Sequence, residues 1–197
     1  MSEATPPVTL FEDVHATQMG QLGLCRPLFE LVCGGMSLRE RFLAVTGVVP
    51  AASLLREHLR PYEASPVDTL GERLYINAAY RAEGESWSRI QALAAETALV
   101  TSDERLLALR TAFPADRVRA IVHGADDGLP GTLAVAPAGN VTLVRHPWEL
   151  VTSLEEHLHA DLLLAIEGDA FTVLDADQTG EGVLVRGQRV HVAPNVS

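Results

Sequence analysis

The sequence predicts an α/β protein with a mostly parallel sheet, followed by a short β-rich module. Short apolar runs of strand length alternate with helical segments through residue 165. From about Phe171 the segments become short and β-rich, and Gly and Asp turns separate them. We therefore expect an α/β domain over residues 1–170 and a second, β-rich unit over residues 171–197.

The first elements follow from local signals. Val8 to Phe11 is a short apolar run after two prolines, and it predicts the first strand. Ser37 is a suitable N-cap and Glu40 stands three residues later, at the capping-box position, so Leu38 to Val45 is predicted as a helix. Pro50 to Leu59 predicts a second, short helix.

The middle of the chain combines a strand, a polar residue and a helix. Leu74 to Asn77 is predicted as a strand that ends on a polar side chain, and Ser86 to Ala95 has the spacing of an amphipathic helix. This order is the usual layout of an α/β ligand site. The remaining predictions are strands over Ala98 to Thr101 and Val118 to His123, a helical turn over Leu106 to Thr111, and a hairpin of Thr132 to Ala136 with Asn140 to Val144.

A long helix and a β-rich tail complete the predicted elements. Glu149 to Ala165 is expected to be one amphipathic helix. His157 and His159 lie two residues apart on it, point to different faces and are expected to be solvated. Leucines recur on the helix at i+4 spacing at positions Leu150, Leu154, Leu158 and Leu162. The tail strands are predicted over Phe171 to Leu174, Val183 to Val185 and Val190 to Val192.

The composition limits the chemistry. The chain contains no lysine, so its fifteen basic residues are all arginine, which excludes Schiff-base catalysis and a P-loop lysine. A formal charge of −11 argues against a nucleic-acid surface. No apolar stretch predicts a membrane span, and a cytoplasmic location is expected. Cys25 and Cys33 have the spacing of neither a zinc site nor a disulfide framework and are expected to be two buried thiols.

The segment from Gln21 to Phe42 is the strongest candidate for an anion site. Arg26 precedes a proline, and Gly34 with Gly35 permits close approach of a ligand to the backbone. A structural salt bridge from Arg26 to Glu30 or Glu40 is an equally good interpretation.

Two further polar positions also leave alternatives open. Asn77 either reads a base or sugar edge or is an ordinary turn-entry residue. Asp126 and Asp127 lie in a Gly/Pro-rich loop, where they either hold a divalent cation or form a turn.

Several of these motifs together resemble the sugar nucleotidyltransferase-like family that is related to the N-terminal domain of N-acetylglucosamine-1-phosphate uridyltransferase. The family pattern of a Pro-Leu-Thr-x-x-Arg-Pro block, a Gly and an Arg-Glu-Lys-Trp helix start is matched here at several positions, and the run from Pro147 matches its later Pro-Trp-Asp-Leu element. The matching residues are Leu22, Arg26, Pro27, Gly35, Arg39, Glu40 and the run from Pro147 to Leu150, with Leu74 to Asn77 resembling an internal strand.

The resemblance implies a Rossmann-like nucleotide-diphospho-sugar transferase fold that binds a nucleoside triphosphate and a sugar 1-phosphate. It implies that Arg26 and Arg39 neutralise phosphate charge, and that Gly34, Gly35 and Asn77 contact substrate. Mg²⁺ is implied as cofactor, with Asp103 or Asp126 as its ligand. The tail would begin a left-handed β-helix, which forms homotrimers in relatives.

The chain also departs from the family pattern. The Gly-x-Gly-Thr-Arg phosphate loop of active pyrophosphorylases would fall at residues 13–20, where the sequence reads DVHATQMG. Leu28 stands where the family has a basic residue, and Arg41 replaces a helix lysine. Three functions therefore stay open: a nucleotidyltransferase, a catalytically silent nucleotide-sugar-binding or oligomer-scaffolding domain, and a structural domain with no ligand.

Overall fold

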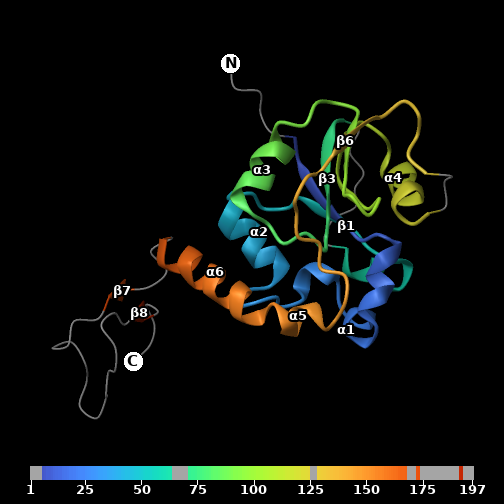
Figure 1. Ribbon diagram of the computed structural model, residues 1–197. Helices are drawn as coiled ribbons and strands as arrows, with labels where there is room; N and C mark the ends of the chain where they lie inside the picture. The colour runs from blue at the N-terminus through green and yellow to red at the C-terminus, as the bar shows by residue number, and fades with distance from the viewer. Residues whose placement is uncertain (1–5, 64–70, 125–127, 168–171, 174–190, 193–197) are drawn as a thin grey trace, which may run out of the picture.

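The central sheet confirms the α/β part of the predicted fold class, with mostly parallel strands. The computed structural model describes residues 6–63, 71–124, 128–167, 172–173 and 191–192 (Figure 1). Six strands form one sheet in the order β2-β1-β3-β5-β4-β6, in which β5 runs antiparallel to its neighbours and the other pairings are parallel. These strands are β1 (Val8–Phe11), β2 (Ala52–Leu54), β3 (Arg73–Asn77), β4 (Thr97–Val100), β5 (Leu106–Thr111) and β6 (Ala134–Pro137).

Alternation along the central strands divides the core between the two faces of the sheet. Leu10 and Ile76 belong to the larger apolar cluster, whereas Phe11 and Tyr75 belong to the smaller one. Helices α2 (Leu38–Thr46) and α3 (Gly84–Gln91) supply the larger cluster, and α4 (Ala115–Val122) supplies the smaller. The sheet is therefore covered on both faces.

The predicted capping box forms as expected. Ser37 Oγ accepts from the Glu40 N–H at 3.2 Å, and the Glu40 carboxylate accepts from the Ser37 N–H at 2.7 Å. Gly47 ends α2 in the left-handed region, with φ of 67°. Phe42 of α2 meets Trp87 of α3 edge to face, with ring centroids 5.3 Å apart. A local signal and one aromatic contact thus fix these two helices on the sheet.

Four predictions for the middle of the chain were wrong. The helix expected over residues 50–59 is replaced by β2, which pairs with β1, and by the 3-10 helix η3 (Glu57–Tyr62). Residues 106–111 form β5 rather than a helical turn, because they pair with β3 and β4 on both sides. Residues 118–122 lie in α4 rather than a strand, since Val118, Ile121 and Val122 recur at helical spacing and are buried. The expected hairpin is absent from its position, because β6 pairs in parallel with β4.

The helix predicted over residues 149–165 differs from the structure in two ways: it is interrupted, and its buried face is polar rather than the leucine face. Two helices form, α5 (Glu149–Thr152) and α6 (Leu154–Glu167), with Ser153 between them. The buried residues of α6 are His157 and Asp161. The leucine stripe faces outward, since Leu154, Leu158 and Leu162 are 39%, 44% and 50% exposed. The expectation that His157 is solvated was therefore wrong.

The tail is described only in part. Strands β7 (Thr172–Val173) and β8 (His191–Val192) pair antiparallel, whereas successive rungs of a β-helix stack in parallel. The strand predicted over residues 183–185 lies outside the described residues, so the β-helix and the domain boundary near residue 170 stay predictions. None of the described helices has the length and apolar character needed to cross a bilayer.

The segment between β1 and β2 is mostly irregular and leads to the site. Its short elements are the 3-10 helix η1 (Val14–Met19), the helical turn α1 (Gln21–Leu24) and the 3-10 helix η2 (Leu28–Glu30), which precede α2. Asp13 caps η1 by accepting from the His15 N–H at 3.0 Å. The backbone that follows β1 is therefore fixed by the side-chain cap from Asp13, and it does not form a glycine-rich turn.

Candidate functional site

The carboxyl ends of β1, β2, β3 and β4 lie at one edge of the sheet, where the antiparallel β5 begins. Open α/β sheets bind ligands at this edge, because the loops that leave parallel strands diverge there. Buried polar side chains gather at the edge. They are Glu12, Asp13, Arg56, Asn77, Thr101 and Arg105.

A bidentate ion pair between Asp13 and Arg105 is the centre of this edge. Arg105 donates from Nε and Nη2 to Asp13 Oδ2 at 3.1 and 3.0 Å, and both side chains are more than nine-tenths buried. Asp13 Oδ2 also accepts from Asn77 Nδ2 at 2.9 Å. Three strand ends are thereby joined through one carboxylate. Removing either charge would leave the other buried without its partner.

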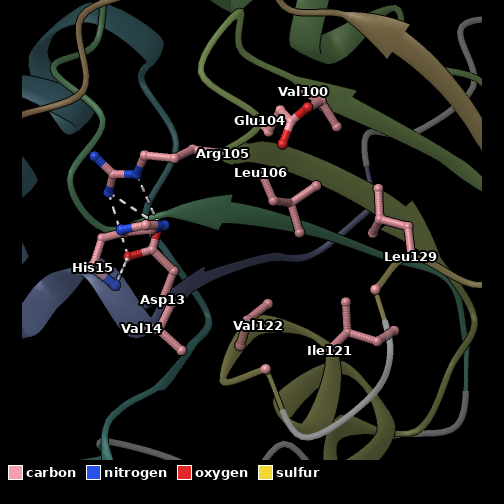
Figure 2. A pocket seen from close by; sticks show the side chains of 12 residues that line it. Asp13, Val14, His15, Val100, Glu104, Arg105, Leu106, Ile121, Val122 and Leu129 are labelled. Carbon is pink, nitrogen blue, oxygen red and sulfur yellow. Dashed lines mark hydrogen bonds and ion pairs between the residues drawn. The ribbon is translucent and has the colours of Figure 1, made fainter.

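A cavity of about 220 Å³ opens beside this pair. Figure 2 shows the polar side chains of Asp13, His15 and Arg105 at one side of it, with Ile121 and Leu129 at the opposite side. Glu104 lies at the turn between β4 and β5 in the left-handed region, with φ of 63°. The remaining lining residues are Val14, Val100, Leu106, Val122, Gly124 and Gly128.

A second buried ion pair, Glu12 with Arg56, holds the segment after β1 in place. Glu12, fully buried, accepts from Arg56 Nε at 2.9 Å and from the Leu28 N–H at 2.8 Å. Arg56 also donates to the carbonyl of Gly23. The segment that carries the Arg-Pro corner is therefore held to the ends of β1 and β2 by one carboxylate and one guanidinium.

The candidate residues from the sequence separate into different places. Asn77 lies at the sheet edge, where its side chain also donates to the Leu106 carbonyl at 2.9 Å. Arg26 is exposed and is not among the residues that line the cavity. Arg39 is half-exposed, pairs with Glu30 at 2.7 Å and lies over the ring of Phe29. The structure does not bring the two arginines to the cavity, and their roles stay predictions.

Gly34 and Gly35 contact α6 instead of open space. The Gly35 N–H donates to Asp161 Oδ2 at 2.9 Å. Gly34 has φ of 98°, and a Cβ built on it would stand 2.4 Å from the same oxygen. The anion expected at these glycines is thus a carboxylate of this chain. Their assignment to substrate is untested.

Of the two predicted metal ligands, the structure describes Asp103 but not Asp126. Asp103 pairs with Arg145 at 3.2 Å. Partial burial raises the pKa of Asp103, but hydrogen bonds from Thr101 and its own backbone, with the nearby guanidinium of Arg145, outweigh this and lower it overall. Asp126 lies outside the described residues, between Gly124 and Gly128, which line the cavity. In the ranges that the structure describes, no three acidic, His or Cys side chains converge on a metal-sized site.

The two cysteines differ in their environment. Cys25 is exposed, so the expectation of two buried thiols was wrong for it. Cys33 is buried, and its Sγ lies 3.1 Å from His157 Nδ1. Burial raises the pKa of the Cys33 thiol, and burial together with the charge of Arg81 lowers the pKa of His157. Both groups are accordingly neutral near pH 7.

The sequence reasoning did not find Asp13 and Arg105. Asp13 directly follows the first strand, a position that the carboxyl-edge rule singles out. Arg105 was hidden because residues 106–111 were predicted as a helical turn, and only a strand there places Arg105 at the sheet edge. LLALRT is a short apolar run that is buried at most of its positions, and assigning it as a strand would have placed Arg105 at the sheet edge.

Comparison with known proteins agrees with this architecture. None of the curated proteins matches the sequence significantly. A family model described as sugar nucleotidyl transferase matches residues 8–169, from β1 to just after α6. The match includes the sheet, its carboxyl edge and α6. Because it covers most of the chain, the protein belongs to the sugar nucleotidyl transferase family.

Proposed function

We propose that this protein transfers a nucleotidyl group to a sugar 1-phosphate, with the nucleotide bound at the carboxyl edge of the sheet. An oxygen of the sugar phosphate attacks the α-phosphorus of a nucleoside triphosphate, and pyrophosphate leaves with the electron pair of the broken bond. The observation that carries the proposal is the cavity beside Asp13 and Arg105 in a member of this family. The site lies where α/β sheets bind nucleotides.

The cavity favours one part of the nucleotide over the whole. Ligand pockets for entire drug-sized molecules measure about 300–1,000 Å³, so a cavity of about 220 Å³ suits a base with its ribose. Val100, Leu106 and Leu129 supply apolar walls for the faces of a base. The phosphates would then extend toward the rim, where the β4–β5 turn carries Glu104.

The charges at the rim favour a metal-bound triphosphate. The Asp13 carboxylate is neutralised by Arg105, whereas Glu104 has no side-chain partner within the described part of the chain. Mg²⁺ is commonly held by one or two carboxylates together with substrate phosphates. Glu104 lines the cavity and would be the first ligand of a cation shared with the substrate, and Asp103, which is paired with Arg145, and Asp126 are further candidates. The cation would offset the charge of the triphosphate against the acidic rim.

A second function, a catalytically silent nucleotide-sugar binder, is favoured by the start of η1. A phosphate loop would direct free backbone N–H groups at the nucleotide after β1. Here the N–H of His15 is already engaged by Asp13 at 3.0 Å. The groups that active relatives use for phosphate charge, placed by resemblance at Arg26 and Arg39, also lie away from the cavity lining. This arrangement preserves binding and weakens transition-state stabilisation.

Nucleotide-induced stabilisation and pyrophosphate release separate these functions. A panel of nucleoside triphosphates and nucleotide sugars, with and without Mg²⁺, is expected to raise Tm, because a ligand that binds only the folded state stabilises it by mass action. Pyrophosphate is then measured after a sugar 1-phosphate is added. Binding with release supports the transferase, and binding without release supports the silent domain. A panel with no stabilisation contradicts both.

A matched pair of variants locates the binding. Val14 lines the cavity and is 46% exposed, so Val14→Trp fills the space without disturbing the core. Val49 is 73% exposed and precedes β2, at the opposite edge of the sheet, so Val49→Trp is the control. The nucleotide-induced rise in Tm should be lost in the first variant and kept in the second. Equal rises in both would place the ligand elsewhere.

From the family resemblance we also propose that the protein forms a homotrimer. Residues 171–197 would begin a left-handed β-helix, through which the protein would form a homotrimer. Sedimentation of the natural full-length protein tests this directly, since a monomer at all concentrations would contradict it.

A further inference from the structure

The most unusual feature outside the cavity is the way in which α6 is attached. It contacts α2 (Figure 1), but the side chains that it buries are the polar residues His157 and Asp161. Its leucines at positions 154, 158, 162 and 163 are exposed, with Leu158 and Leu162 at 44% and 50%, and its other apolar residues are only partly buried. A helix on a core normally buries the opposite set. The attachment of α6 therefore depends on polar contacts rather than on apolar burial.

Most of those contacts converge on one carboxylate, and the others involve His157, whose Nδ1 lies 3.1 Å from Cys33 Sγ and whose carbonyl accepts from Arg81 Nη2 at 3.3 Å. Asp161 is 2% exposed, and its Oδ2 accepts from the Gly35 N–H at 2.9 Å. Its Oδ1 accepts from Arg81 Nη2 at 3.1 Å and from Arg41 Nη1. We call the three donors, the Gly35 N–H and the guanidinium groups of Arg41 and Arg81, the anion cradle. They come from the loop before α2, from α2 itself and from the segment after β3.

The cradle carries more positive charge than Asp161 neutralises. Arg41 and Arg81 supply two guanidinium groups, both about 95% buried, for a single carboxylate. A further carboxylate, that of Glu83, accepts from Thr142 Oγ1 at 3.1 Å and attracts the Arg81 guanidinium without a hydrogen bond to it. Arg81 Nε is buried and has no hydrogen-bond partner among the residues described. A phosphate group carries about −1.5 to −2 charges and three acceptor oxygens, which match two arginines better than one carboxylate does.

Space and backbone geometry also suit a larger anion. A cavity of about 200 Å³ adjoins the carboxylate and is lined by Gly35, Met36, Leu158, Asp161, Leu162 and Ala165. Gly34 has no side chain between its backbone and Asp161 Oδ2, so an oxyanion can approach the backbone closely here. Its φ of 98° is also unfavourable for residues other than glycine. Gly35 and Asp161 border this cavity, so an entering anion would meet the carboxylate and the Gly35 N–H before it reached the two arginines.

We propose that the anion cradle is a binding site for a phosphate group, that Asp161 occupies it as an internal anion, and that phosphate binding releases α6. A phosphomonoester or inorganic phosphate replaces the carboxylate at Gly35, Arg41 and Arg81. Because α6 is attached mainly through that carboxylate, the exchange of one anion for another frees the helix. The inference is independent of catalysis at the sheet edge.

Amide hydrogen exchange of the unmodified protein tests the release. Exchange of α6 amides is compared in inorganic phosphate, in a sugar 1-phosphate and in sodium chloride of equal ionic strength. If phosphate binds only the released state, a concentration ten times its Kd raises α6 exchange about tenfold, while amides of β3 stay unchanged. The phosphate source that acts at the lower concentration is the preferred ligand. Unchanged or slower α6 exchange with both would overturn the proposal.

Charge variants test the site itself. Asp161→Asn keeps the size of the side chain and leaves the cradle without its anion, so inorganic phosphate should raise Tm more in this variant than in the wild type. The gain should vanish in Asp161→Asn/Arg81→Gln. Glu63→Gln, in the partly buried Glu63–Arg119 pair, is the matched control and should respond like the wild type. If Asp161→Asn folds but phosphate raises its Tm no more than that of the wild type, the site is refuted. If Asp161→Asn does not fold, the hydrogen-exchange measurement on the unmodified protein decides instead.

Discussion

Removing the charge of Arg105 is the sharpest test of the sheet edge. Arg105→Met leaves the Asp13 carboxylate buried, and its remaining donors among the described residues are the His15 N–H and the Asn77 amide. Breaking a buried pair from one side costs about 3–5 kcal/mol. Domains of ordinary size have about 5–15 kcal/mol of total stability, so the variant should fold but be marginal.

The double variant isolates the charge from the loss of packing. In Asp13→Asn/Arg105→Met no charge is left uncompensated, and replacing both partners of a buried pair is often nearly neutral. We expect the double variant to be about 2 kcal/mol or more stable than Arg105→Met alone. Arg145→Met breaks a partly exposed pair and should change stability by no more than about 1 kcal/mol.

Urea unfolding followed by the fluorescence of the buried Trp87 measures these differences. A loss below about 1 kcal/mol in Arg105→Met would show that the pair contributes no more than an exposed one. A double variant that is less stable than Arg105→Met would show that Asp13 is needed for its other hydrogen bonds rather than for its charge. Either result would refute the reasoning.

Three further predictions concern the cap, the buried histidine and the outward leucines. Ser37→Ala removes the cap of α2 and should lower the free energy of unfolding by about 1 kcal/mol, whereas Ser88→Ala, in the exposed part of α3, should be neutral; urea midpoints compare them. The pKa of His157 is lowered in the folded state by burial and by Arg81, from an ordinary value of 6.5, so protons bind the unfolded state more strongly. Stability should therefore fall as pH drops below 6.5, and His157→Gln should lose less stability over this range; equal pH profiles would contradict the assignment. Leu162→Gln should change stability by no more than about 0.5 kcal/mol, because the side chain is outside the core, whereas Ile90→Ala should cost about 2–5 kcal/mol; a large loss in Leu162→Gln would mean that something covers α6.

The fold class was predictable because its signals are local. Val8–Phe11 and residues 74–77 are strands in both the prediction and the structure, and their apolar runs are buried on both faces as a parallel sheet requires. The capping box at Ser37 and Glu40 also needs only four residues to form. The segment Leu106–Thr111 was mistaken because its state depends on pairing with β3 and β4, which lie outside any short window.

The site was predictable only in outline. Asn77 could be singled out, because a polar residue at a strand end is visible in the sequence. Its partners Asp13 and Leu106 lie 64 and 29 residues away, and no spacing rule joins them. The loop with Gly34 and Gly35 was expected to hold a ligand anion, which stays a prediction, and in the structure a carboxylate of the chain lies there. That the anion is Asp161, 126 residues beyond Gly35, depends on how α6 returns to the loop.

The sequence by itself determined the mixed α/β class, the arginine-only basic chemistry and the family resemblance, since each resides in residue types and short spacings. The tertiary structure alone decided which charges meet. Asp13 with Arg105, Glu12 with Arg56, and Asp161 with Arg41 and Arg81 are buried pairs between distant segments. The physical reason is that a charge can be buried only where an opposite charge is brought to it, and the packing of the whole chain sets that position.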